Sequence, residues 1–439
     1  MHPHFLARER IGEIEPRGAA PAFRLPPFVY QCLLPPTCTD PHVSLPRWPL
    51  QVGRSLCDVY HRHPPFVQHY LLGEPAPDFR PLNAAYPDVP IEIIDRPRSF
   101  AMPGAPALPL RRDAQHLASR QYVPPLDFVA CLPETTYCST HHVLLDEQRQ
   151  IVRESCNAGK LEYFHLRDFY EAPARRISGP VTPWKLRFFN YYHLLIEALP
   201  RLLALERTTL FSSPGDVQLL CPGGLSATDR FFLTKLGLDR LPILEVEAGP
   251  LYTTEALVLS SLKTQLQSGF LPPWYAQTMQ ERLLPARPSK RSRRLFISRE
   301  RAWRRGIANN AAVTAALRDY GFEPVVMEEL TPQQQIEVVY DAEAVVAPHG
   351  AGLTNILFGR HLRVLELFPG TEIAPHYVFL AASLGHHYEY LLGTEQTLNP
   401  SAFTVDVEAL REAVEHLLTP PTAAPIRLAL PTRASPVGG

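Results

Sequence analysis

The sequence predicts an α/β protein in which strands and helices alternate and build doubly wound parallel sheets. The clearest alternation fills the last third of the chain, and a second begins after Arg187. Between Ala344 and Phe358, AVVAPHGAGLTNILF, an apolar run breaks at a glycine turn and continues with helical character. A buried strand, a glycine turn and a helix start together present backbone N–H groups to an anion. This stretch predicts a site for a phosphate-bearing ligand.

The elements of the last third follow from apolar runs and capping signals. Gly321 is expected to end one helix. Thr331 is expected to cap the next helix, because proline stands at the first helical position and Gln334 follows three residues after Thr331. The predicted order is strand 295–299, helix 310–320, strand 323–327, a helix from 332, strand 344–348, a helix after the glycine turn, strand 364–367, helix 377–384, strand 388–392 and helix 407–418. In such a sheet the ligand lies beyond the carboxyl ends of the strands.

The middle of the chain predicts a second set of elements. Residues 141–155 have two apolar runs around a polar turn, which is typical of a hairpin. The segment from Phe188, FFNYYHLLIEALPRLLALER, predicts a helix that is interrupted at Pro200. Strand 216–221, helix 227–236 and further short strands to Ser261 follow, and this alternation predicts a parallel sheet.

Proline content suggests where the domains begin and end. Residues 1–130 hold many of the 47 prolines, so we expect an irregular region with short strands there. The proline- and base-rich stretch 283–294 predicts a boundary between one domain of residues 131–288 and another of residues 289–419. Residues 420–439, rich in proline and alanine, predict a disordered tail.

Composition excludes several classes of function. The 439 residues carry 43 Lys+Arg against 44 Asp+Glu, so no overall field attracts nucleic acid. The seven cysteines have neither zinc-module nor CxxC spacing, and we expect no metal site and no cofactor. The first residues lack a signal-peptide apolar segment, and no run of ~18 apolar residues occurs. We expect a cytoplasmic protein, at most peripheral to the inner membrane.

The first candidate site joins the glycine turn to two arginines. Arg299 and Arg305 follow the end of a predicted strand and are placed to make charge-assisted bonds to a diphosphate. The turn and the helix after it supply the remaining diphosphate candidates, His349, Gly350, Ala351, Gly352, Leu353, Thr354 and Asn355. The alternative interpretations are an ordinary tight turn and a solvated basic loop.

The second candidate is a stripe on the helix after Arg187. Offsets of three and four residues place Asn190, His193 and Glu197 on one helical face, where the carboxylate can bond the imidazole and raise its basicity. Such a pair can take a proton from a hydroxyl. The alternative is a buried polar network that holds a domain interface.

The third candidate is Glu366, at the end of a predicted strand. A carboxylate there can accept both hydroxyls of a ribose, although a surface salt bridge is the alternative. His376 and Tyr377 open the next predicted helix and are candidates for contacts to the phosphate or the sugar; the alternative is that the aromatic ring only packs.

Together these motifs resemble glycosyltransferase family 61. The resemblance runs in order through NYYHLLIEALPRLLALE, ISRERAWRRGIAN and LTPQQQIEVVYDAEAVVAPHGAG into HGAGLTNILF, and covers roughly residues 140 to 395. The family includes bacterial capsule, lipopolysaccharide and exopolysaccharide transferases and eukaryotic xylosyl- and N-acetylglucosaminyltransferases. Residues 1 to about 130 show no such resemblance.

The resemblance implies a GT-B fold, in which two Rossmann-like domains face each other and the C-terminal one holds a nucleotide-sugar. It implies inverting transfer without a bound metal. Arg299, Arg305, His349, Gly350, Gly352, Thr354 and Asn355 match the family's donor-side motifs. His193 and Glu197 match the acceptor-facing helix, with the assignment of the general base between them open.

The function expected from the sequence is transfer of a sugar from a nucleotide-sugar, with UDP as the expected nucleotide, to a hydroxyl of a glycan or glycolipid acceptor, as in capsule or lipopolysaccharide synthesis. Two rival functions are a nucleotide-sugar epimerase of the same architecture and a non-catalytic scaffold that binds nucleotide or glycan. An epimerase would consume UDP-sugar without an acceptor. A scaffold would bind donor without turnover.

Overall fold

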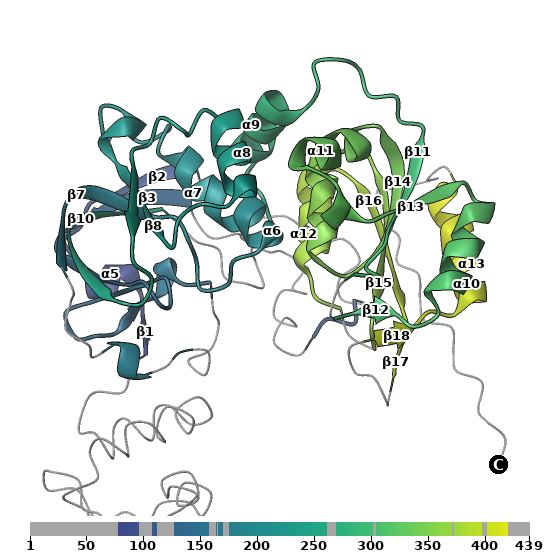
Figure 1. The fold of residues 1–439 in the computed structure, drawn as a ribbon, viewed down its shortest axis with the longest axis horizontal. Helices are drawn as coiled ribbons and strands as arrows, with labels where there is room; N and C mark the ends of the chain where they lie inside the picture. Colours follow the sequence, from purple (N-terminus) through teal and green to yellow (C-terminus); the bar gives the residue numbers. More distant parts are fainter. Residues whose placement is uncertain are drawn as a thin grey trace, which may run out of the picture.

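The structure is a computed structural model that describes residues 78–95, 108–111, 127–157, 164, 166–169, 175–260, 269–301, 304–370, 373–396 and 402–419. Most of the proline-rich region and the predicted tail 420–439 lie outside these residues. The described chain forms a large mixed sheet, a fully parallel sheet and a small third sheet, with helices packed on them (Figure 1). The predicted α/β class is confirmed. No described helix is both long and apolar enough to cross a bilayer.

The first sheet has a parallel half and an antiparallel half. The parallel half is β10 (Leu251–Ser260), β7 (Arg175–Pro183), β8 (Gln218–Pro222) and β9 (Ile243–Val246), in that spatial order. The other side of β10 pairs with β3 (Asp127–Leu132) and β4 (Thr135–Cys138), beyond which lie β5 (Val143–Leu145), β6 (Ile151–Val152) and β1 (Phe79–Arg80), while β2 (Ile91–Asp95) pairs with β3. The predicted parallel sheet is therefore found only in part, because tight turns such as the one joining β5 to β6 give antiparallel pairs. The β5–β6 pair confirms the predicted hairpin.

The helix that carries His193 is continuous across the predicted break. Asn190 caps its start, accepting from the N–H groups of Tyr192 at 2.9 Å and His193 at 3.3 Å. It runs as α6 (Tyr191–His193), a π turn η7 (Leu194–Ala198) and α7 (Leu199–Ala204). Pro200 lacks the N–H that would continue the ladder, and the chain widens to a π turn just before it instead of breaking. The helices α8 (Ala227–Lys235) and α9 (Pro273–Leu283) follow.

The second sheet is parallel throughout and confirms the doubly wound prediction for the last third. Its spatial order is β13 (Phe322–Val325), β11 (Arg293–Ile297), β14 (Ala342–Pro348), β15 (Arg363–Phe368) and β16 (His387–Leu392). Numbered along the chain this is 2-1-3-4-5, so the winding reverses between β11 and β14. A small sheet of β12 (Gly306–Ile307), β18 (Ala402–Thr404) and β17 (Thr394–Glu395) adjoins it. In sheets of this order the ligand binds at the reversal.

Helices cover both faces of the second sheet. One face carries α10 (Asn310–Asp319) and α13 (Val407–Leu418), which lie to the right in Figure 1. The other carries α11 (Pro332–Tyr340), η10 (Ala351–Phe358) and α12 (His376–Leu384). Thr331 forms the predicted capping box with Gln334. The segment after the glycine turn is a 3₁₀ helix, a tighter form than the α-helix usual in such units.

The two large sheets share one apolar core through their helices. Leu195 and Leu202, from the His193 helix, belong to the same buried cluster as Ile356 of η10. Phe232 of α8 stacks on Phe358 of η10, with ring centroids 6.5 Å apart and planes 8° apart. The site described below therefore rests on a packed junction between the two sheets.

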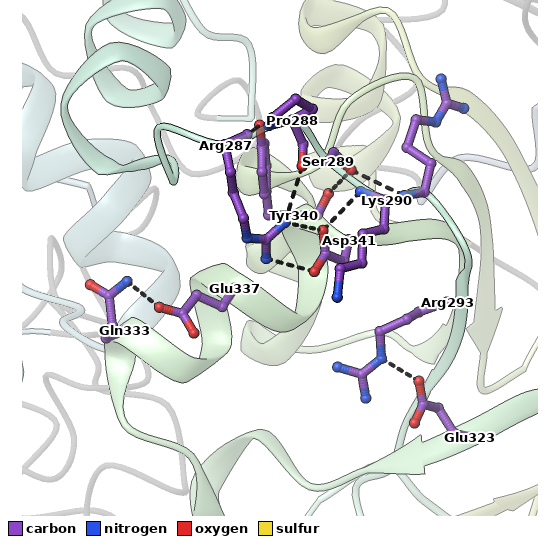
Figure 2. A network of polar contacts seen from close by, with 11 residues as sticks. Arg287, Pro288, Ser289, Lys290, Arg293, Glu323, Gln333, Glu337, Tyr340 and Asp341 are labelled. Carbon is purple, nitrogen blue, oxygen red and sulfur yellow. Dashed lines mark hydrogen bonds and ion pairs between the residues drawn. The ribbon is translucent and has the colours of Figure 1, made fainter.

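Residues 284–292 link α9 to β11, and a polar network at Asp341 fixes this linker to the end of α11 (Figure 2). The Arg287 guanidinium donates two hydrogen bonds to the Asp341 carboxylate, at 2.8 and 2.7 Å, and the Lys290 N–H donates a third at 3.0 Å. The Tyr340 hydroxyl donates to the Arg287 carbonyl at 2.6 Å. The predicted domain boundary at 283–294 thus falls on a segment that is held in place by hydrogen bonds.

Asp341→Asn is expected to destabilise the fold in a pH-dependent way. The bonds from Arg287 lower the pKa of Asp341 to about 2, below its ordinary 3.8. The stabilisation is therefore complete above about pH 4 and is lost as the pH falls through about 2. Because Arg287 is 43% exposed, we expect a loss of about 1–2 kcal/mol at pH 7. Urea unfolding at pH 7 and pH 2.5 measures it, and Glu323→Gln, which breaks the exposed pair with Arg293, is the control. A penalty of equal size at both pH values would contradict the role of the charge.

Candidate functional site

The candidate site begins where β11 and β14 end, side by side at the reversal of the second sheet. Arg299 follows β11, and His349 and Gly350 follow β14. A Cβ atom on Gly350 would lie 1.7 Å from Nη1 of Arg299. The guanidinium therefore lies directly against the backbone of the turn, in space that any larger residue would fill. The structure brings together the arginine and the glycine turn that the sequence singles out.

Arg299 and Arg305 gather positive charge beside this turn. Both are half-buried, and no described carboxylate lies within salt-bridge distance of either. Arg299 donates from Nη2 to the Arg304 carbonyl at 3.0 Å, whereas its Nε is buried without a partner. Burial lowers the pKa of both guanidinium groups, and their mutual repulsion lowers that of Arg305 further. Two cations without an acidic partner are arranged to receive an anion.

Glu366 lies behind His349, not in the open site. Its carboxyl group is fully buried and contacts His349 Nδ1 at 2.5 Å and the Tyr388 hydroxyl at 2.5 Å. Burial raises the pKa of Glu366 well above its ordinary value, and burial with nearby arginine charge lowers that of His349. Burial therefore disfavours the charged form of each group. The predicted contact between Glu366 and ribose hydroxyls is corrected, because both of its oxygens already have protein partners.

Three of the residues predicted to bind the sugar donor support the glycine turn from the protein interior. Leu353, Thr354 and Asn355 are buried. Tyr377 donates to the Gly350 carbonyl at 2.7 Å and lies 3.2 Å from the Thr354 hydroxyl. Among the predicted turn residues, Ala351 and Gly352 keep part of their surface exposed. The buried residues therefore hold the shape of the turn instead of lining it.

Asn355 joins the two sheets by hydrogen bonds. Its Oδ1 accepts from the Tyr191 hydroxyl at 2.8 Å, across the junction. Its Nδ2 donates to Gln335 Oε1 and to the Gly352 carbonyl, each at 3.0 Å. The glycine turn is thereby tied to the start of the helix that carries His193.

Edge-to-face and tilted contacts between aromatic rings complete the junction. The ring of Tyr192 lies 5.4 Å from His193, 5.4 Å from His376 and 5.6 Å from Tyr377, measured between centroids. His376 in turn lies 5.8 Å from His349. Burial lowers the pKa of His376 well below its ordinary value, and the charges of nearby histidines and arginines add to this. His193 and the glycine turn therefore belong to one cluster, as the sequence interpretation requires.

His193 and Glu197 form the predicted pair. His193 Nδ1 lies 2.7 Å from Glu197 Oε2, and both side chains are almost completely buried. Asn157 Nδ2 donates to the same oxygen at 2.7 Å and to the Phe188 carbonyl at 2.9 Å. Asn157 Nδ2 also lies 3.4 Å from His193 Nδ1, so the three side chains form one hydrogen-bonded group. The other ring nitrogen, Nε2, has no partner among the described residues. Asn190, predicted on the same helical face as His193 and Glu197 and an acceptor-side candidate, caps the start of this helix.

The sequence comparison decides what kind of protein holds this site. A family model described as Glycosyltransferase 61 matches residues 191–372, which include His193, both arginines and the glycine turn. The chain contains a glycosyltransferase family 61 domain. A comparison with curated proteins gives no match. The scaffold and epimerase interpretations are set aside, since the domain is that of a glycosyltransferase.

Two residues outside the matched stretch of the family 61 domain were missed from the sequence. Asn157 comes from the loop after β6 and orients Glu197. Arg111 comes from the proline-rich region: Leu110 forms a parallel bridge with Ile373, and the Arg111 N–H donates to the Ile373 carbonyl at 3.1 Å. Its charge contributes to the lowered pKa of His349 and of His376. Neither residue belongs to a periodic pattern or a motif, so the sequence held no signal for them.

A metal site in the family 61 domain or beside it would need several His, Cys, Asp or Glu side chains close together. No group of three or more His, Cys, Asp or Glu side chains in the described part of the chain is placed to hold a metal ion.

Proposed function

We propose that this glycosyltransferase moves a sugar from a nucleotide-sugar, UDP-linked in the first instance, to a hydroxyl of a glycan acceptor. The observation that carries the proposal is the half-buried Arg299 against the glycine turn at the reversal of the parallel sheet, with the charge of half-buried Arg305 nearby and no described acidic partner for either. A diphosphate supplies the negative charge that this arrangement lacks. The first N–H groups of η10 and its dipole add to the attraction.

The same groups explain how the leaving group is stabilised. As the sugar departs, charge develops on the diphosphate oxygen; the Arg299 guanidinium already lies against the turn that holds the diphosphate, and the charge of Arg305 lies near it. His349, whose Nδ1 contacts Glu366, can donate from Nε2 to the same diphosphate. In this proposal the arginines provide the positive charge, so transfer does not require a metal ion.

The nucleophile is activated across the junction. The acceptor hydroxyl gives its proton to the His193–Glu197 pair while its oxygen forms a bond to the anomeric carbon. The bond from that carbon to the diphosphate oxygen breaks, and its electron pair leaves with the nucleotide. Attack from the face opposite the leaving group inverts the anomeric configuration. The family resemblance supports a glycan or glycolipid acceptor in polysaccharide synthesis.

A panel of nucleotide-sugars, scored by thermal shift and then by transfer, tests the proposal. A donor at 100 times its dissociation constant stabilises the fold by about 2.7 kcal/mol. We expect UDP-sugars to give the largest shifts and to be consumed quickly only when an acceptor is added. Absence of a shift with every nucleotide-sugar would contradict the donor site.

A further inference from the structure

A small cavity lies beside the catalytic helix, between its residues 196–204, the end of β10 and the start of α9. Glu197, Arg201, Ser260 and Trp274 are among its lining residues. It leaves about 20 Å³ for the centre of a water molecule, and one ordered water needs roughly 10–15 Å³. The cavity therefore has room for one ordered water.

The Asp127 carboxylate also lines this cavity. Besides it, three polar atoms on the lining residues are buried without a hydrogen-bond partner among the described residues. They are Glu197 Oε1, Arg201 Nε and Trp274 Nε1. Native proteins rarely leave such atoms unpaired, and ordered water is the usual partner when protein groups are missing. One of the three atoms accepts and two donate. A single water satisfies all three, since its oxygen accepts two N–H bonds while one of its hydrogens donates to the carboxylate.

We propose that an ordered water in this cavity joins Glu197 to Arg201 and Trp274, which makes these two residues positioning residues for His193. The inference rests on the proposed function and deepens it. Glu197 Oε2 already contacts His193 Nδ1 and accepts a hydrogen bond from Asn157. With Oε1 bonded to water, every side of the carboxylate is occupied.

This arrangement assigns the general base that the sequence left open. Glu197, held on both oxygens, keeps its role as acceptor for the Nδ1–H of His193. The acceptor's proton then goes to His193 Nε2, the ring nitrogen without a described partner. Burial lowers the pKa of Arg201 to about 10, offset in part by Glu197, so its guanidinium is still a cation near neutral pH.

Trp274→Phe tests the inference because it removes one N–H and keeps an aromatic ring. We expect kcat to fall about twofold to tenfold, as for one lost hydrogen bond, with the donor KM unchanged. Trp184→Phe is the matched control: Trp184 is fully buried and its Nε1 also lacks a partner, but it does not line the cavity. Equal kinetics for the two variants would overturn the inference.

Arg201→Met and Arg201→Lys separate charge from packing. Arg201→Met removes the cation and is expected to lower kcat and to move the acid limb of the kcat/KM profile to higher pH. Arg201→Lys keeps a positive charge and is expected to restore part of kcat and part of the pH profile. If the Arg201→Met variant does not fold, the comparison of Trp274→Phe with Trp184→Phe still tests the inference.

A crystal structure at high resolution gives the direct answer. Density for one water bonded to Glu197, Arg201 and Trp274 supports the inference, and a dry cavity overturns it. This readout requires no substrate, so it is independent of the donor. A dry cavity in an enzyme that still needs His193 for transfer would refute the water site alone, and a filled cavity without UDP-sugar turnover would refute the proposed function alone.

Discussion

Replacement of His193 by alanine is expected to lower the rate of sugar transfer by about 10²–10⁴-fold. The Glu197 carboxylate lies 2.7 Å from Nδ1 of this imidazole, and its second nitrogen has no partner among the described residues. Loss of the imidazole removes the proton acceptor without touching the arginines. Steady-state kinetics with a nucleotide-sugar and a glycan acceptor measures the change in kcat.

Donor binding is the internal control for this variant. Because His193 lies across the junction from the glycine turn, the thermal shift given by the nucleotide-sugar should match that of the wild-type protein. Glu197→Gln keeps the size of the side chain and should give a smaller loss than His193→Ala. An alanine variant that transfers sugar at the wild-type rate would remove His193 from the mechanism.

Arg305→Ala is expected to reduce turnover by about 10²–10³-fold and to weaken donor binding. Arg305 is half-buried beside Arg299, and no described carboxylate neutralises it, so its charge is directed to whatever anion enters. The donor KM and the thermal shift with UDP-sugar should change together, in contrast to the His193 variant. Both are measured with the same purified protein.

Arg301→Ala is the matched control for Arg305. It lies on the same loop, is 63% exposed and pairs with Glu329, so its removal should leave kcat and donor KM near their wild-type values. Equal losses for the two variants would point to a general charge effect of the loop. An unaffected Arg305→Ala variant would show that the diphosphate lies elsewhere.

The C-terminal half of the fold could be predicted from sequence because its local signals agree with its tertiary structure. The capping box at Thr331 and the apolar run before His349 specify one helix and one strand whatever surrounds them. The first sheet was predicted only in part. Whether β10 pairs in parallel with β7 or antiparallel with β3 depends on chain connections and packing, and apolar periodicity does not record this.

The site could be predicted as a set of residues more readily than as a set of contacts. Spacing of four residues placed Glu197 on His193, since a helical turn brings them together. Spacing could not show that Glu366 is covered by His349 and Tyr388, or that Asn355 reaches Tyr191, because these contacts arise between elements. Asn157 and Arg111 were missed for the same reason.

The bridge between Leu110 and Ile373 sets an order on folding. Contacts between distant parts of a chain form late, because closing a long loop costs entropy before the contact is gained. During synthesis β3 and β4 can pair with β10 only after β10 has been made. Leu110 can pair with Ile373 only after the last fifth of the chain has begun to be made. Arg111 therefore reaches His349 and His376 among the last events of folding. A nascent chain that lacks its final segments holds the His193–Glu197 pair without the complete surroundings of the proposed anion site.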